Sequence, residues 1–418
     1  MEVIHICSSN FYKSSYIYID EVTSLVFDLG TFNCRIGYSG EDNPYCVFRP
    51  VIGIDGETYF YNDKLQYHSP DMKLLTYMDK NGTIEDYNLF ENMLNNLLDE
   101  QFKVNIQDYP ILFTEPSLHN KEHRKKLTNF MFEKYNIPAM FICKNAVLSA
   151  FSCGRSTCLV FDSGHYNTCA VPVHDGYALQ KCLIKSEIAG DYITKLVRKK
   201  IESQNIKINP FYKIKKRRKE DHFITEILSN VSAQPVYEDY WKDEIYREIK
   251  EICLIASEEA IPYNEENDTF TATSMNHVIS YDLPDGNTIE LAEDRMFLVE
   301  RVFNSVKSLP GFFGYHQMID DAISKASVDI KRDLYGNIFV CGGNTLFGNF
   351  PDRLQKQLQE INKITKLKII THPSITERKF STWIGGSILS SLGSFHQFWL
   401  SKQEYEEHGD MIIERKCA

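Results

Sequence analysis

Two stretches of this chain repeat the same order of apolar and polar positions. Residues 25–30 read Leu-Val-Phe-Asp-Leu-Gly, and a second short strand pattern follows at 35–40. Residues 159–164 read Leu-Val-Phe-Asp-Ser-Gly, and an apolar stretch at 170–173 and a turn at 174–176 follow them. Each pattern predicts a buried strand that pairs with its neighbour in a hairpin. Because the two copies are separated by the length of a domain, the repeat favours two similar α/β lobes over a solenoid of short units.

The segment between the two copies, and the one after the second copy, predict further elements. Residues 110–116 predict a strand that Pro116 ends, and the mixed amphipathic spacing of 119–135 predicts a helix after it. Residues 180–203 have a helical pattern, and Pro210 breaks the pattern that follows them. We therefore expect a helix on each side of the second hairpin.

A third glycine-containing phrase lies near the end of the chain. Residues 338–347 predict a strand, a Gly-Gly turn and the start of a helix that continues through Leu354. Residues 383–392 contain small and apolar side chains and predict a helix suited to close packing. The first 23 residues show no clear period and are interpreted as an N-terminal extension, residues 1–23.

The segment 213–219 is the most polarised part of the chain, with six basic residues in seven. Two interpretations stay open. The run can be the solvated face of a loop, or it can be a nuclear-import signal or a contact for an acidic partner.

Composition narrows the class of protein. The chain has 418 residues, 43% hydrophobic and 25% charged, which predicts two or three folded domains and excludes disordered and fibrous classes. No window approaches the roughly 18 apolar residues of a membrane helix, and the start lacks a secretory signal. The net charge of −11 argues against direct nucleic-acid binding, because duplex binding depends on neutralising phosphates. The same negative charge would attract basic partners such as histones.

The 11 cysteines are an odd number with no C-x-x-C pair, which is typical of a reduced compartment. Cys153 and Cys158 are the nearest approach to a metal cluster, but no second pair follows them at zinc-finger spacing. We therefore expect no zinc site.

The glycine turns at the strand ends carry the candidate chemistry. A phosphate chain is held by backbone N–H groups only where no side chain obstructs its approach, so such turns recur at phosphate sites. Asp28 and Asp162 stand where a divalent cation on those phosphates would need acids that reach it through water. A single Asp-x-Gly turn is usually only hairpin chemistry. Two matching hairpins together with Gly342 and Gly343 predict a nucleotide cleft.

These features resemble the nucleotide-binding fold shared by actin, sugar kinases and heat-shock chaperones, and the likeness to the actin family is much closer. The similarity runs from about residue 25 to residue 416, and the blocks that carry it are 112–116, 146–149, 281–286, 328–335, 383–389 and 401–405. Within the family the chain is most similar to the actin-related protein four class, the actin-like subunits of chromatin remodellers and histone acetyltransferases. The phrases behind this finer likeness are 173–177, 189–194, 377–381 and 414–417.

The resemblance implies an actin-like α/β fold, with two duplicated lobes divided into four subdomains. The expected boundaries are 24–49, 78–152 and 381–418 for the first subdomain, 50–77 for the second, 153–188 and 311–380 for the third, and 189–310 for the fourth, which carries the basic insertion.

The resemblance also implies the residues of an ATP site. Asp28 and Asp162 would hold Mg²⁺ through water. The other nucleotide contacts that it implies are Gly30, Thr31, Arg35, Ser163, Gly164, Arg247, Lys250, Glu251, Gly342, Gly343, Phe347 and Lys379. By spacing alone, the three residues between 247 and 251 would be an ordinary exposed helix face with i, i+4 pairing.

Several positions depart from the actin pattern at the phosphate end. Phe32 and Tyr166 stand where actin has small glycines, Arg35 replaces a phosphate-binding lysine, and His165 replaces an acid. The two positions that orient the attacking water in actin hold Asn145 and Cys169 in this chain. Since in-line positioning of that water carries hydrolysis, we expect very slow turnover or none.

The function expected from the resemblance is a non-enzymatic nuclear scaffold that binds ATP structurally within chromatin-remodelling or histone acetyltransferase complexes. The rival interpretations are a slow ATPase or kinase of the same superfamily and a cytoskeletal filament subunit. The altered Asn145 and Cys169 weigh against the first rival. A short connection, residues 54–58, replaces the long loop through which actin makes filament contacts and weighs against the second.

The resemblance implies partners as well. The expected ones are a helicase-associated helix of a remodeller or acetyltransferase subunit, nuclear actin and histones, with neither nucleic acid nor membrane bound directly. The helix would enter a partner groove between the first and third subdomains, at positions matched by Phe151, Gly154, Gly176, Leu389, Leu392 and Phe398. The alternative is that these apolar residues are ordinary core.

Overall fold

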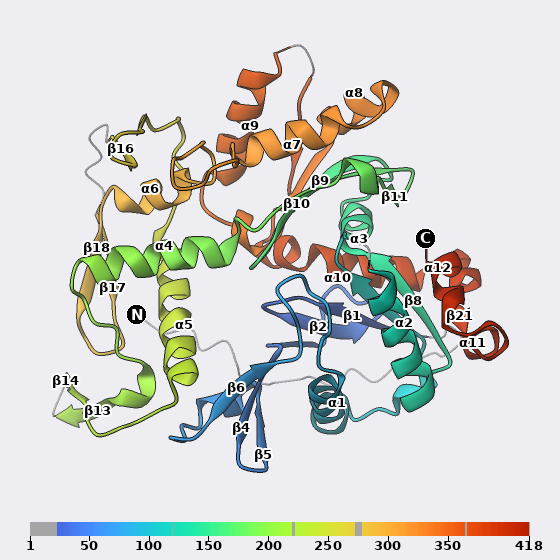
Figure 1. Ribbon diagram of the computed structural model, residues 1–418, viewed down its shortest axis with the longest axis horizontal. Helices are drawn as coiled ribbons and strands as arrows, with labels where there is room; N and C mark the ends of the chain where they lie inside the picture. Colours follow the sequence, from blue (N-terminus) through green and yellow to red (C-terminus); the bar gives the residue numbers. More distant parts are fainter. Residues whose placement is uncertain (1–22, 119, 220–221, 272–277, 364–365, 418) are drawn as a thin grey trace.

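A computed structural model describes residues 23–118, 120–219, 222–271, 278–363 and 366–417. In these ranges the chain forms two α/β lobes, each built on a six-stranded sheet (Figure 1). This is the fold class that the sequence predicts. The expected N-terminal extension, residues 1–23, lies outside the described residues except for Thr23. Among the described helices we find none with the length and apolar character needed to cross a membrane.

The first lobe contains a mixed sheet in the order β21-β8-β7-β1-β2-β3. Leu25–Leu29 (β1) pairs antiparallel with Cys34–Tyr38 (β2) and parallel with Ile111–Glu115 (β7). All residues of β1 and β7 are buried, as their apolar runs predict, and β7 ends immediately before Pro116. The other strands of this sheet are β3 (Cys46–Phe48), β8 (Ala139–Lys144) and β21 (Leu400–Ser401).

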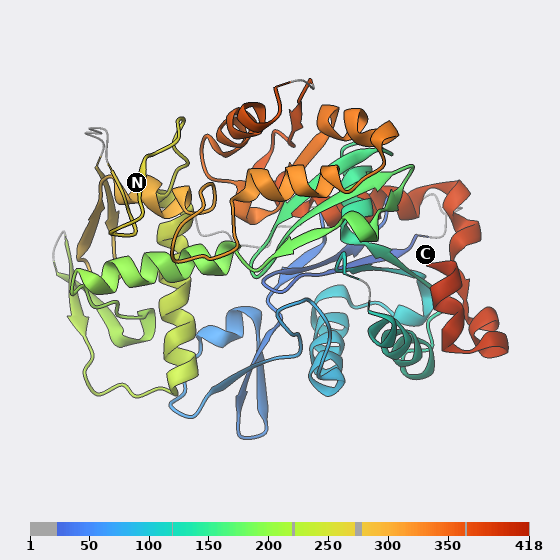
Figure 2. The same ribbon diagram turned by 45° about the horizontal axis from the view of Figure 1, so that its top comes forward.

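The second lobe repeats this arrangement. Cys158–Ser163 (β9) pairs antiparallel with Thr168–His174 (β10) and parallel with Ile338–Cys341 (β19), so β19 takes the place that β7 has in the first lobe. The duplication predicted from the repeated phrase is therefore confirmed. Figure 2 shows the blue strands of the first sheet and the green strands of the second running toward the middle of the molecule. The second sheet also contains β11 (Tyr177–Ala178), β12 (Ile184–Ser186) and β20 (Ile369–Ile370).

Two helices cross between the lobes. Asn145–Ser152 (α3) follows β8 directly, and Ile375–Ser391 (α10) packs across it (Figure 1). A Cβ added at Gly385 would lie 1.8 Å from the carbonyl oxygen of Leu148, so the crossing requires glycine at this position. Trp383 is fully buried and donates its indole N–H to a carbonyl of β1 at 3.1 Å. The helix predicted from small residues is confirmed, and these small residues allow α10 to pack closely on α3.

A small three-stranded sheet in the order β5-β4-β6 projects from the first lobe. Val51–Asp55 (β4) and Thr58–Tyr61 (β5) are joined by two residues, and Gly56 takes the left-handed conformation at φ +59°. The short connection predicted at 54–58 is therefore a tight hairpin turn. Lys73–Thr76 (β6) completes the sheet and contacts the long helix Pro235–Cys253 (α5).

An aromatic cluster fixes this small sheet to α5. Tyr237 of α5 is fully buried against Leu65 and Met72, and its hydroxyl donates to the carbonyl of Leu65 at 3.0 Å. The ring of His68 stacks on Tyr212 with centroids 4.6 Å apart. The small sheet of the first lobe is thereby held against the second lobe.

The remaining helices in the described ranges are α1 (Tyr87–Asn96), α2 (Lys121–Asn129), α4 (Gly190–Ser203), α6 (Asp294–Glu300), α7 (Tyr315–Ser324), α8 (Val328–Gly336), α9 (Phe350–Ile361), α11 (Lys402–His408) and α12 (Ile413–Lys416). Three two-stranded hairpins extend the second lobe: β13 (Ile214–Lys219) with β14 (His222–Ile227), β15 (Tyr263–Asn264) with β16 (Thr269–Phe270), and β17 (Ile279–Asp282) with β18 (Thr288–Leu291).

Two sequence predictions need correction. Residues 180–203 do not form one helix. The strand β12 lies between a short helical turn at residues 180–182 and α4, and it pairs antiparallel with β10. The basic run 213–219 is not a loop, since six of its residues form β13 and pair along their full length with β14. In both cases pairing with a neighbouring strand overrides the local side-chain pattern.

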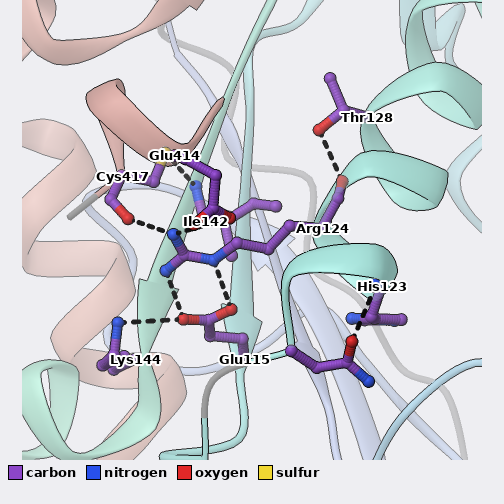
Figure 3. Close-up of polar contacts among 9 residues, drawn as sticks. Glu115, His123, Arg124, Thr128, Ile142, Lys144, Glu414 and Cys417 are labelled. Carbon is purple, nitrogen blue, oxygen red and sulfur yellow. Dashed lines mark hydrogen bonds and ion pairs between the residues drawn. The ribbon is translucent and has the colours of Figure 1, made fainter. Parts of the chain in front are cut away.

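A buried ion pair attaches the C-terminal segment to the first lobe (Figure 3). The side chain of Arg124 on α2 is 2% exposed, and its Nε donates to Glu115 at 2.8 Å. A second nitrogen of the same guanidinium donates to the carbonyl oxygen of Cys417. Lys144 lies 3.3 Å from the Glu115 carboxylate, and the amide of Ile142 donates to the Cys417 sulfur at 3.2 Å. These contacts hold α12 against β7, β8 and α2.

Candidate functional site

A cavity of about 220 Å³ lies between the turn that joins β1 to β2 and the turn that joins β9 to β10. The start of α4, the C-terminal half of α5, the Gly-Gly turn after β19 and the first half of α10 complete its wall. Most of the predicted nucleotide contacts line this cavity: Asp28, Gly30, Thr31, Arg35, Asp162, Gly164, Arg247, Lys250, Glu251, Gly342, Gly343 and Lys379.

Two predicted contacts lie elsewhere. Ser163 is fully buried, and its hydroxyl pairs with Thr168 at 2.7 Å and accepts from Asn344 at 3.0 Å. Side chains alternate between the faces of a strand, so Ser163 points away from the face that Asp162 occupies. Phe347 is 7% exposed and packs in the core of the second lobe. Neither residue lines the cavity.

The two hairpin turns also share a four-residue pattern, which follows the repeated strands and was not predicted. Both read Gly-x-aromatic-Asn, at 30–33 and at 164–167. A Cβ at Gly30 would lie 2.4 Å from the carbonyl oxygen of Asn33, so the first turn requires glycine. In the second turn the amide of Gly164 donates to Asn167 at 2.9 Å. The Gly164 amide is already used by this hydrogen bond within the turn. A ligand with negative charge would therefore be bound more by side chains than by this backbone.

The two glycines of the Gly-Gly turn differ in their surroundings: the first is crowded and the second is open. Gly342 has φ +92°, and a Cβ there would lie 2.4 Å from a carboxylate oxygen of Asp162. Its amide donates to the carbonyl of Arg378 at 3.1 Å. At Gly343 nothing lies within 4 Å of an added Cβ, so the space beside it is open. The first glycine closes the turn on Asp162, and the second exposes backbone to the cavity.

Asp28 and Arg35 form an ion pair at the end of the cavity that the first hairpin forms. The register of β1 and β2 places these residues opposite each other, and Arg35 Nη1 lies 2.5 Å from Asp28 Oδ2. The other oxygen of Asp28 accepts from the Thr114 hydroxyl at 3.0 Å. The guanidinium of Arg35 lies 5.0 Å from the centre of the Phe380 ring. Both oxygens of Asp28 are therefore engaged by the protein.

The equivalent pair in the second lobe is Asp162 and Cys169, which the register of β9 and β10 also places opposite each other. Burial, together with the charge of Asp28, raises the pKa of Asp162 to about 6, against the opposing effect of Arg35. Burial and the Asp162 charge raise the pKa of the Cys169 thiol to about 12. The thiol is thus protonated at neutral pH and cannot accept a proton from water.

Aromatic and cationic side chains crowd the space between the two turns. The rings of Phe32 and His165 lie 4.6 Å apart, and the guanidinium of Arg49 lies 3.5 Å from the centre of the Phe32 ring. The carboxylate of Glu244 accepts from Arg49 at 2.9 Å and from Arg247 at 2.6 Å. Burial, then the nearby cations, lowers the pKa of His165 to about 3. His165 is therefore a neutral ring, and it bridges the lobes by stacking.

The opposite end of the cavity is formed by α5 and α10. Arg247 pairs with Glu251 at 2.9 Å, and Lys379 lies 4.0 Å from the same carboxylate. Lys250 donates to the carbonyl of Gly190 at 3.1 Å, and burial lowers its pKa to about 8. The helix face predicted from spacing thus lines the cavity, with Lys250 buried and Glu251 still 41% exposed.

Several buried polar atoms on this wall have no hydrogen-bond partner in the described part of the chain. They are Nε of Arg35, Arg247 and Arg378, and Oδ1 of Asn145 and Asn344. An unpartnered buried polar group costs about 1–3 kcal/mol, and guanidinium donors pair well with anions. The three guanidinium donors, together with the open backbone at Gly343, fit a polar ligand with negative charge, and the two amide oxygens can accept from donors of that ligand.

Comparison with known proteins decides the family. The sequence model described as Actin matches residues 19–418. The chain belongs to the actin family. It is 35% identical to "Actin-related protein 4" of Arabidopsis thaliana, over 95% of this chain and 99% of that protein. Proteins of the same name from Oryza sativa subsp. japonica and Schizosaccharomyces pombe are 34% and 31% identical, each over 95% of this chain and 98% or more of their own length.

Some residues at this actin-family site were not predicted. Arg49 does not line the cavity but packs on Phe32, which does; Arg378 lies at the Gly-Gly turn, and Gly190 lines the cavity at the start of α4. Asn344 follows the Gly-Gly pair and carries an unpartnered oxygen. Arg378 and Asn344 adjoin predicted residues and were within reach of sequence reasoning. Arg49 lies outside every motif, so only the tertiary structure finds it.

The residues predicted to form a partner groove lie beside the crossing of α3 and α10. Leu389 is 9% exposed and belongs to a core cluster, against which Phe151 packs. Leu392 and Phe398 are 42% and 49% exposed. Gly154 and Gly176 both have positive φ and end the neighbouring loops, which the Gly176 amide joins by donating to the carbonyl of residue 156 at 2.9 Å.

Proposed function

We propose that this actin-family protein is a nuclear scaffold subunit of chromatin-remodelling or histone acetyltransferase complexes that binds ATP structurally and hydrolyses it very slowly or not at all. One observation carries the nucleotide part: a cavity between duplicated turns combines unpartnered guanidinium donors with side chains unsuited to activating water. The relatives that share the name actin-related protein 4 support the class of protein.

The binding of ATP follows from the wall of the cavity. Anionic phosphates would satisfy the free Nε donors of Arg35 and Arg247, which otherwise leave buried polar atoms unpaired. The open backbone at Gly343 leaves room for a flat base, and Lys379 and Glu251 lie beside that space. The actin-family fold typically binds a nucleotide with a divalent metal.

Slow turnover follows from the residues at the phosphate end. Hydrolysis needs a water held in line with the terminal phosphate and a group to accept its proton. Asn145 offers one unpartnered amide oxygen, the thiol of Cys169 is protonated, and His165 is a neutral ring stacked on Phe32. None of these three is a base at neutral pH, so the site would hold ATP without cleaving it.

Thermal unfolding with and without ATP tests the nucleotide proposal. Because a ligand bound only by the folded state stabilises it by mass action, ATP at about 100 times its dissociation constant adds about 2.7 kcal/mol and raises the melting temperature. GTP at the same concentration controls for non-specific anion effects. An unchanged melting temperature would refute nucleotide binding, and steady phosphate release at the rate of conventional actin would refute the lack of turnover.

The scaffold part of the proposal rests on the partner groove. Leu392 and Phe398 expose apolar surface beside a packed core, and an amphipathic helix needs such a surface to bury its stripe. Partners should be identified by mass spectrometry after purifying the tagged protein from nuclei. Remodeller or acetyltransferase subunits are expected, and their absence from the purified material would refute the scaffold proposal.

A paired variant shows whether the groove is the contact. Phe398→Asp should release the captured partner, since burying a large apolar side chain contributes roughly 1.5–3 kcal/mol. Val328→Asp is a matched control, because Val328 is also an exposed apolar residue but lies at the start of α8. Capture that persists with Phe398→Asp at an unchanged melting temperature would end the groove hypothesis.

A further inference from the structure

Arg35 occupies a fixed position between the strand ends at the phosphate end of the cavity. Its Nη1 lies 2.5 Å from Asp28 Oδ2, and the ring of Phe380 lies 5.0 Å from the guanidinium carbon. The side chain is 16% exposed, and Nε has no partner in the described ranges. The guanidinium therefore binds directly to Asp28, one of the two acids of the predicted magnesium site.

Asp28 in this arrangement does not fit the water shell of a hydrated divalent cation well. Magnesium keeps several waters, and those waters need free carboxylate oxygens nearby. Asp28 uses one oxygen for Arg35 and the other for the hydroxyl of Thr114. Across the described residues there is no group of three or more acids, histidines or cysteines that could hold a metal ion. The protein itself therefore engages both oxygens of Asp28, one of the two acids that the family resemblance assigned to the waters around Mg²⁺.

We infer that Arg35 takes the place of the divalent cation, so that this cleft binds an adenine nucleotide without a metal ion; the inference rests on the proposed nucleotide binding. A guanidinium is permanently charged and presents N–H donors in a planar fork that matches phosphate oxygens. In this position it neutralises phosphate charge with Nε and remains attached to Asp28 by Nη1. A lysine would supply a single point charge and could not hold the acid and the phosphate in the same way.

Affinity for ATP measured with and without magnesium tests this inference. Isothermal titration calorimetry of the full chain is run with excess EDTA and again with excess MgCl₂. For the wild type we expect dissociation constants within threefold of each other. Arg35→Met removes the cation and frees Asp28, so we expect at least tenfold weaker binding in EDTA and recovery of most of that loss when magnesium is added.

Two further variants separate charge from geometry. Arg35→Lys keeps the charge but loses the fork, and we expect it also to bind more tightly with magnesium than in EDTA. Arg332→Met is the matched control, because Arg332 is an exposed arginine on α8 away from the cavity, and it should behave as the wild type. The melting temperature of each variant without ligand shows whether it is folded.

The possible results are distinct. Wild-type binding that weakens more than tenfold in EDTA would overturn the inference and leave the proposed ATP binding intact. The same magnesium response in Arg35→Met and the wild type would overturn it as well. The absence of wild-type binding under both conditions would overturn the proposed nucleotide function itself, and the inference with it.

Discussion

At the scale of single residues, the duplicated hairpins carry different chemistry at equivalent positions. Asp28 faces Arg35 across the first hairpin, whereas Asp162 faces Cys169 across the second. The first acid is neutralised by direct contact with a cation. The second has a neutral thiol opposite it and a raised pKa. The two acids, alike in sequence, therefore differ in their effect on stability.

We predict that Asp162→Asn stabilises the protein at neutral pH. The pKa of Asp162 is raised from 3.8 to about 6 in the folded state, so the native protein holds the extra proton between those values and loses stability as pH rises through them. Above pH 6 the penalty is fully present. Since each pKa unit corresponds to about 1.4 kcal/mol, and the side chain keeps some solvent contact, the variant should gain about 2 kcal/mol at pH 7.5.

Urea unfolding at pH 7.5 and at pH 4.5 measures this effect. The gain should shrink toward pH 4.5, because the wild-type carboxyl is then largely protonated. Asp71→Asn, at an exposed position, should leave the free energy of unfolding nearly unchanged at both values. A variant less stable than the wild type at pH 7.5 would contradict the assigned pKa direction.

At the scale of elements, the crossing of α3 and α10 connects the cavity to the proposed partner groove. The N-terminal half of α10 lines the cavity through Lys379, and Leu392, a residue of the proposed groove, follows its C-terminal end. The same helix contacts α3 so closely at Gly385 that side chains are excluded there. Packing at this crossing therefore sets the geometry of both sites.

We predict that Gly385→Ala destabilises the protein strongly. A Cβ would lie 1.8 Å from the Leu148 carbonyl oxygen, and backbone of a packed helix cannot yield as a flexible side chain does. Overpacking of this kind costs about 1–3 kcal/mol and sometimes more. Gly393→Ala is the control, because no atom lies within 4 Å of a Cβ at that position. Equal melting temperatures for the two variants would show that the crossing is looser than described.

The contact between the small sheet and α5 is a second junction between the lobes. We predict that Tyr237→Phe loosens it, because the carbonyl of Leu65 loses the donor that lies 3.0 Å away. One lost buried hydrogen bond costs about 1 kcal/mol, so hydrogen exchange of β4–β6 amides should speed up by roughly fivefold. Tyr177→Phe, at a residue 65% exposed, should change nothing. Faster exchange confined to β1 and β7 would contradict the assignment of this contact.

At the scale of the whole molecule, the described protein has the two lobes of an actin-family subunit but not the projecting loop. Only two residues join β4 to β5, so the small sheet ends in a tight turn. An open filament requires a head-to-tail interface on both ends of every subunit, and loss of one side stops its growth. We therefore expect that any assembly of this protein has a limited size.

We predict that the protein does not polymerise. In high-speed sedimentation with ATP, high salt and magnesium, it should stay in the supernatant at concentrations where conventional actin pellets. Conventional actin under the same conditions is the positive control. Sedimenting polymer that dissolves again on dilution would refute the prediction, whereas an irreversible pellet would be aggregation.

The repeated strand phrases and the glycine turns allowed the duplicated α/β fold to be predicted from sequence. Strand burial and turn chemistry are local properties, so residues 25–30 and 159–164 reveal them directly. Most of the cavity wall was predicted for the same reason, because its residues sit in those turns or in motifs shared with the family. The split of 180–203 and the strand at 213–219 were missed, since both strands form by pairing with a neighbouring strand, which the side-chain pattern of the segment alone does not reveal.

The sequence by itself determined which residues stand at the strand ends, because chain order and side-chain alternation place them there. Only the tertiary structure decided how they are used. It placed Ser163 in the core and packed Arg49, from the segment between β3 and β4, on Phe32. It also paired Arg35 with Asp28 and left the Nε of Arg35 without a partner in the described residues. The physical reason is that contacts across a cleft depend on how the two lobes pack against each other, and no local sequence pattern encodes the distance between residues of different lobes.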